Sequence, residues 1–172
     1  MIADSFQGPL ANFYWLVKMN SNPAANEYLR TKILTANPQE LRLLLYEGAI
    51  KYSSQARIAI EKKDIEESFD CLMRAQKIVL ELSTSLNHDA APEICEKLSA
   101  LYTYIYRLLV DANVQKDIKL VDEAVKLLEY EKQTWLMLME KTTRESGPDP
   151  GIDQLNVTGA QQTAINSLST DG

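Results

Sequence analysis

A repeated helix-start signal constrains the fold of this chain more than any other feature. In residues 37–40 (NPQE) the asparagine can cap free backbone amides, the proline tolerates the first helical position, and the glutamate can complete a capping box. Asp64 repeats this signal, Pro92 fits the first turn of a third helix, and Asp117 can cap a fourth. Four separate helices are therefore predicted.

The apolar residues between these signals recur with helical spacing, and no strand-like alternation competes with them. Short connections between long helices favour antiparallel neighbours. We therefore expect an all-α fold, an antiparallel up-down-up-down four-helix bundle over 38–144, with a short N-terminal segment packing on it. The expected helices cover about 38–63, 64–86, 92–112 and 117–142.

The expected helices carry more apolar surface than a bundle core needs. A bundle helix needs an apolar stripe of little more than about 100°, whereas these arcs approach about 200°. Gly48 lies on the packed face of the first helix, where we expect a neighbouring backbone to approach closely, at about 1 kcal/mol of helix propensity. Large exposed apolar surface usually marks a binding site, so the surplus predicts a groove for an amphipathic partner segment. The candidate groove residues are Leu43, Tyr46, Ile50, Tyr102, Tyr106, Leu109, Val110, Leu120, Leu127 and Leu138.

Several function classes lack support in the sequence. The net charge is −6 and no basic stripe is present, which argues against a nucleic-acid partner. His88 is the single histidine, and the metal-binding Glu-x-x-His pairs of ferritin-like bundles are absent, as are phosphate loops and nucleophile elbows. We therefore expect no enzyme activity, no metal and no cofactor.

The positions of the cysteines and the hydropathy of the chain predict its cellular compartment. Cys71 and Cys95 both lie in apolar helical patterns, which favours free buried thiols in a reducing compartment. No apolar run approaches the roughly 20 residues that span a bilayer, and Asp4 precedes the apolar N-terminal stretch, where a secretory signal would carry cations. A cytoplasmic protein that does not insert into membranes is expected.

One span of the sequence carries a motif that leucine-rich helices do not share in general. Tyr28 is followed by ILTANP at 33–38, by EL at 40–41 and by LLYEGAI at 44–50. This order resembles the signature of the flagellar export chaperones of the FliS family. Further similarity extends over about residues 20–143: DIE at 64–66, LEL at 80–82, LLE at 127–129 and Trp135.

The resemblance implies a function as well as a fold. Members of this family are bundles that bind newly made flagellin in the cytoplasm, hold its C-terminal region against premature polymerisation and help deliver it to the export gate. The resemblance also implies that an N-terminal segment, here 19–37, covers part of the client surface beforehand. Tyr28, Ile33 and Leu34 are the apolar side chains expected to hold that cover in place.

Both ends of the chain extend beyond the part that resembles the family. Met19-Asn20 looks like a family opening, so we expect residues 1–18 to be a dispensable extension. Residues 145–172 are rich in Gly, Ser, Thr, Gln and Asp and are expected to be a disordered tail. The alternative function is a non-catalytic adaptor, or a structural bundle that assembles with itself through the same apolar stripes.

Overall fold

The computed structural model describes residues 23–89 and 91–145. Within these residues the chain forms five helices and no strand, which confirms the predicted all-α class. The expected extension at 1–18 lies outside the described residues, as does the tail expected at 145–172 apart from Glu145, which ends α6. The helices are α2 (Pro23–Thr35), α3 (Pro38–Glu61), α4 (Ile65–Thr84), α5 (Pro92–Gln115) and α6 (Ile118–Glu145).

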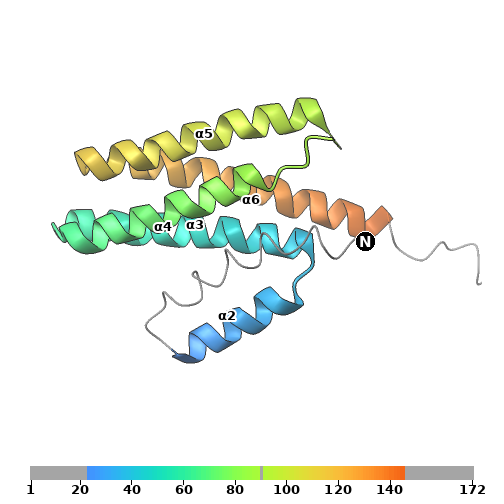
Figure 1. Ribbon diagram of the computed structural model, residues 1–172, viewed down its shortest axis with the longest axis horizontal. Helices are drawn as coiled ribbons and strands as arrows, with labels where there is room; N and C mark the ends of the chain where they lie inside the picture. Colours follow the sequence, from blue (N-terminus) through green and yellow to red (C-terminus); the bar gives the residue numbers. More distant parts are fainter. Residues whose placement is uncertain (1–22, 90, 146–172) are drawn as a thin grey trace, which may run out of the picture. The chain divides into compact units, whose positions relative to one another are not determined.

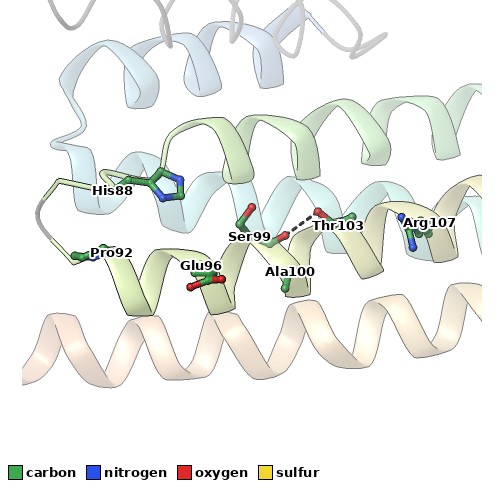
Figure 2. Close-up of a pocket in the computed structure, with 7 residues that line it drawn as sticks. All are labelled: His88, Pro92, Glu96, Ser99, Ala100, Thr103 and Arg107. Carbon is green, nitrogen blue, oxygen red and sulfur yellow. Dashed lines mark hydrogen bonds between the residues drawn. The ribbon is translucent and has the colours of Figure 1, made fainter.

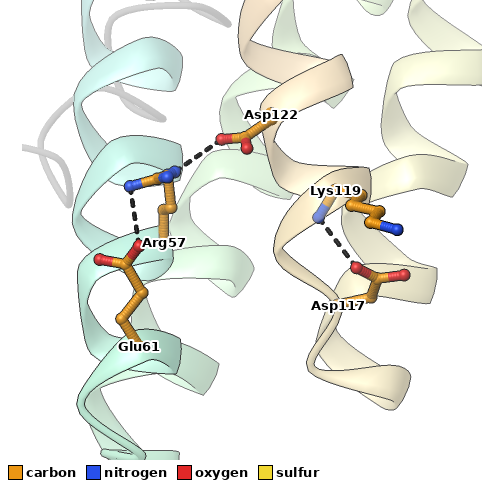
Figure 3. Close-up of polar contacts among 5 residues, drawn as sticks. All are labelled: Arg57, Glu61, Asp117, Lys119 and Asp122. Carbon is orange, nitrogen blue, oxygen red and sulfur yellow. Dashed lines mark hydrogen bonds and ion pairs between the residues drawn. The ribbon is translucent and has the colours of Figure 1, made fainter.

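The predicted helix starts are confirmed by their hydrogen bonds. The Asn37 side chain accepts from the Glu40 amide at 2.8 Å, and the Glu40 carboxylate accepts from the Asn37 amide at 2.9 Å, which completes a capping box at the start of α3. The Asp64 carboxylate caps α4 by accepting from the Glu67 amide at 3.0 Å. The Asp117 carboxylate accepts from the Lys119 amide at 2.9 Å just before α6 (Figure 3).

Two tight reversals keep neighbouring helices antiparallel. Lys63 follows α3 with a φ of 60°, and Lys116 follows α5 with a φ of 54°. Both residues adopt the left-handed backbone conformation, which often terminates helices and turns the chain sharply. Only short connections are therefore needed between α3 and α4 and between α5 and α6.

The described residues up to Met137 form one compact unit, and those from Leu138 form a second. Within the first unit, α4 packs along both α3 and α5, and α6 contacts α3 and α5 (Figure 1). All four helices contribute to one buried core, which also includes Ile33 of α2. This arrangement is the predicted bundle with an N-terminal segment packed on it.

Small buried side chains dominate the facing sides of α3 and α4. Ala49, Ala56 and Ser53 of α3 and Ala75 of α4 are all fully buried, and such side chains let two helices approach closely. Gly48 is half-buried beside Ala49, so the expected close approach of a backbone there stays a prediction.

Polar contacts join α6 to its neighbours. Figure 3 shows Arg57 of α3 between Asp122 of α6, at 2.7 Å, and Glu61 of its own helix, at 3.1 Å. At the other end of α3, the Trp135 indole donates to the Gln39 carbonyl at 3.0 Å. The exposed ion pairs contribute at most about 1 kcal/mol each. They nevertheless show that α3 and α6 are antiparallel.

Candidate partner-binding surface

Three of the ten candidate groove residues lie in the core, which corrects the sequence-based assignment. Tyr46 is 2% exposed, Tyr102 is 1% exposed and Leu109 is fully buried. The hydroxyls of Tyr46 and Tyr102 lie 2.5 Å apart, so each tyrosine satisfies its polar atom inside the bundle. Because the two hydroxyls pair with each other, both tyrosines can be buried in the core, although the spacing of apolar residues had placed them in the candidate groove.

Burial raises the pKa of both phenols. For Tyr46 this effect outweighs the lowering by the Tyr102 hydrogen bond and by the charge of Arg42. For Tyr102, the neighbouring Tyr46 adds to the increase in pKa. Both side chains therefore stay protonated at neutral pH and act as structural groups.

Five further candidates are half-buried, so a partner could touch only part of each. Ile50 of α3 and Leu120 and Leu127 of α6 pack against the core with one side. Leu43 of α3 and Val110 of α5 have similar intermediate exposure. These side chains are open enough to add to an interface and buried enough to be held in place.

The remaining two candidates are exposed. Tyr106 of α5 is 37% exposed, and Leu138, which belongs to the second compact unit, is 49% exposed. Tyr106 precedes the half-buried Val110 by one helical turn, so both lie on one side of α5. The ten candidates therefore include core residues, half-buried residues and exposed residues.

The structure also exposes large apolar side chains that the sequence analysis did not select. Ile65 and Phe69 lie one turn apart at the start of α4, with the Lys116 ammonium 6.0 Å from the Phe69 ring centre. Ile94 of α5 is exposed as well. The signal for the first pair was available, because Ile65 and Phe69 lie four residues apart in a segment that also holds Glu66, Glu67 and Asp70. The other exposed examples include Leu80, Tyr104, Val114, Tyr130 and Met137.

The N-terminal helix α2 is attached through a different face from the one predicted. Ile33 is 5% exposed and belongs to the core, and Leu29 and Ala36 pack against that core. Leu29 and Ile33 lie one helical turn apart on one face of α2, and Ala36 directly follows the helix. Tyr28 at 70% exposure and Leu34 at 65% lie off that face. Ile33 therefore holds the segment in place, and the expectation for Tyr28 and Leu34 was wrong.

A polar cluster lies around the buried tyrosine pair. The Arg42 guanidinium lies 5.0 Å from the centre of the Trp135 ring and donates to the Ser85 carbonyl at 3.4 Å and hydroxyl at 3.3 Å. Glu131 of α6 is half-buried and acts electrostatically on both tyrosines. Burial raises the pKa of the Glu131 carboxyl.

A shallow hollow of about 710 Å³ runs along α5 next to the α4–α5 connection (Figure 2). Charged and polar side chains line much of it, and the Thr103 hydroxyl donates to the Ser99 carbonyl within the helix at 2.8 Å. None of its lining residues belongs to the candidate groove that the sequence predicted. The lining residues are His88, Pro92, Glu96, Ser99, Ala100, Thr103 and Arg107.

Both cysteines lie inside the bundle. Cys71 and Cys95 are both free and buried, as predicted. Burial, followed by the hydrogen bond to Glu67, raises the pKa of Cys71 to about 12, which keeps the thiol protonated. No group of metal-ligating side chains occurs among residues 23–89 and 91–145, and no described helix is long and apolar enough to cross a membrane.

Comparisons with known proteins agree with the bundle architecture. Residues 20–142 match the family model described as flagellar protein FliS. The chain is 32% identical over 125 residues to the flagellar secretion chaperone FliS of Bacillus subtilis (strain 168), covering 73% of this chain and 92% of that protein. It is 28% identical over 116 residues to the flagellar secretion chaperone FliS of Salmonella typhimurium, covering 67% and 86%.

A solved structure supports the same fold. The crystal structure of a flagellar chaperone from bacteria aligns with a TM-score of 0.58 and 22% identity, covering 69% of this chain and 96% of that one. The family match spans α3, α4 and α5, and it includes the buried tyrosine pair and the α2 anchor. From residue 20 to residue 142, this chain belongs to the FliS family of flagellar proteins.

Proposed function

We propose that this protein is a cytoplasmic export chaperone that binds the C-terminal region of flagellin. By holding that region it prevents premature polymerisation, and it helps to deliver the client to the flagellar export apparatus. The relatives are named flagellar secretion chaperones, and the family match covers the whole of α2 to α5. A non-catalytic binding role is consistent with the free buried thiols.

The observation that carries the proposal is the distribution of apolar side chains outside the core. Ile50, Leu120 and Leu127 pack against the core with one side, while Tyr106 remains exposed on α5. Half-buried apolar side chains can be covered by a helical segment without any change in the bundle. They are also rigid, so little side-chain entropy is lost when a client binds.

The N-terminal helix has the properties of a removable cover. One fully buried apolar side chain contributes about 1.5–3 kcal/mol, and Ile33 is the one such residue in the described part of α2. That contribution is enough to hold a short helix in place, and a client with more apolar contacts could still displace it. We therefore propose that α2 covers part of the client-binding surface and is displaced when the client binds.

Co-expression with flagellin of the same organism tests the proposal. The two proteins should elute together in size-exclusion chromatography, and flagellin truncated at its C-terminal end should not elute with the chaperone. If the chaperone instead forms an oligomer with itself and leaves flagellin unbound, the adaptor or self-assembling alternative replaces this proposal.

A further inference from the structure

Glu131 occupies a position where the fold alone would favour an apolar residue. It follows the fully buried Leu128 by three residues and precedes Trp135, which packs against the core, by four. Residues at these spacings share one face of a helix. Placing a carboxylate on the face directed to the core costs free energy unless a partner compensates its charge.

The described part of the chain does not supply that partner. Among residues 23–89 and 91–145 the Glu131 carboxylate makes no hydrogen bond and no ion pair. Arg42 acts on the same two tyrosines, but its guanidinium is directed to Ser85 and stacked over Trp135. Burial is the cause that raises the pKa of Glu131. The carboxylate is half-buried, so it can be reached from outside.

Half-buried apolar side chains accompany this carboxylate. Glu123, Leu127 and Glu131 recur every four residues along α6, and Glu123 accepts a hydrogen bond of 2.6 Å from the Tyr104 hydroxyl of α5. That bond places this stripe of α6 beside α5. Leu127, and Leu101 on α5, both pack against the core with one side. We call this set, Leu101, Leu127 and Glu131, the α5–α6 seam.

We propose that the α5–α6 seam binds a client segment that carries a lysine or arginine among apolar residues, and that Glu131 receives this cation. The inference rests on the proposed function and names the chemistry of the client at this site. Charge complementarity selects the occupant, because a cation compensates the half-buried carboxylate in surroundings that screen less than water. A second copy of this chain, with a net charge of −6, is a poorer partner.

The proposal predicts that removing the charge of Glu131 raises the stability of the free protein and lowers its affinity for the client. Glu131→Gln keeps the shape and removes the charge, so it should stabilise the free protein by removing a half-buried carboxylate that no described residue compensates. The same change should weaken client binding about tenfold, because the client cation then loses its partner. A purely structural role for Glu131 would lower both stability and affinity.

Glu129→Gln is the matched control. Glu129 lies on the same helix and is exposed, so its replacement removes an equal charge away from the core-facing side. Wild type and both variants, each as the full chain, are compared by urea unfolding and by calorimetric titration with the flagellin C-terminal region at low and high salt. Glu131→Gln should unfold at higher urea and bind more weakly with a shallower salt dependence, while Glu129→Gln should match wild type.

Replacing each lysine and arginine of the flagellin fragment by alanine completes the test. One of these replacements should weaken binding to wild type and leave binding to Glu131→Gln unchanged, as expected for a coupled pair. If Glu131→Gln binds within about twofold of wild type, or unfolds at lower urea, the inference is overturned while the proposed function stands. If wild type itself does not bind the fragment, both are overturned.

Discussion

Replacing Tyr46 or Tyr102 by phenylalanine removes one hydroxyl from a pair that is buried across the core. The two oxygens lie 2.5 Å apart, and the side chains are 2% and 1% exposed, so water cannot replace the lost partner. Leaving one buried hydroxyl unpaired costs about 1–3 kcal/mol. We expect Tyr46→Phe and Tyr102→Phe each to fall within this range, since in either variant the remaining hydroxyl loses its partner. Arg42 acts electrostatically on both tyrosines, so it does not favour one single variant over the other.

The double variant separates pairing from simple loss of polar groups. Replacing both partners by groups of the same shape is nearly neutral, so it should cost less than either single change. The free energies of unfolding are measured in urea for wild type, both single variants and the double variant. If the sum of the two single effects equals the effect of the double variant to within about 0.5 kcal/mol, the hydroxyls are not coupled and the buried hydrogen bond between them is refuted.

The same pair predicts a loss of stability at alkaline pH. Burial holds the pKa of both phenols above the unfolded value of about 10. Their contribution is therefore fully present below about pH 10 and is lost as the pH rises further, because the unfolded chain then releases protons that the folded chain retains. Unfolding measured in urea between pH 8 and pH 11 should show a steeper decline for wild type than for the double phenylalanine variant.

Four further predictions separate the core, the surface, the N-terminal helix and the N-terminal extension. Ile105→Ala should cost about 2–5 kcal/mol in urea unfolding, because Ile105 is fully buried. Tyr106→Asp should leave stability within about 1 kcal/mol of wild type but abolish flagellin binding by calorimetry; normal binding would place the client elsewhere. Ile33→Ala should speed amide hydrogen exchange throughout α2, whereas Tyr28→Ala should not; equal effects would contradict the assigned anchor. Deleting 1–18 should change the free energy of unfolding by less than about 1 kcal/mol, and a larger loss would make that extension part of the fold.

Helix starts and fold class could be predicted from the sequence because they depend on local chemistry. An asparagine or aspartate side chain satisfies free amides of the helix that follows it, so Asn37 and Asp64 cap their helices whatever packs beside them. The helical spacing of the apolar residues likewise predicted helices that pack together in a bundle, and Ala49, Ile105 and Leu128 are fully buried there. These predictions needed no knowledge of how the helices are placed around one another.

The candidate site could be predicted only in part because exposure depends on neighbouring helices. A helical wheel gives the direction of a side chain but not the width of the arc that neighbours cover. Tyr46 and Tyr102 appeared to face outward until their hydroxyls were found paired inside the core. Tyr28 and Ile33 looked equally suited to hold the N-terminal segment, and the docked face of α2 decided between them. Glu131 was missed, because a single carboxylate in a helix resembles any surface residue.

Calorimetric titration of the full chain with the flagellin C-terminal region of the same organism tests the central claim most directly. Binding should be saturable, with a negative heat-capacity change, because a client helix covers apolar surface on the bundle. Flagellin lacking that region should give no heat of binding. Equal binding of the truncated flagellin, or no binding of the C-terminal region, would contradict the account.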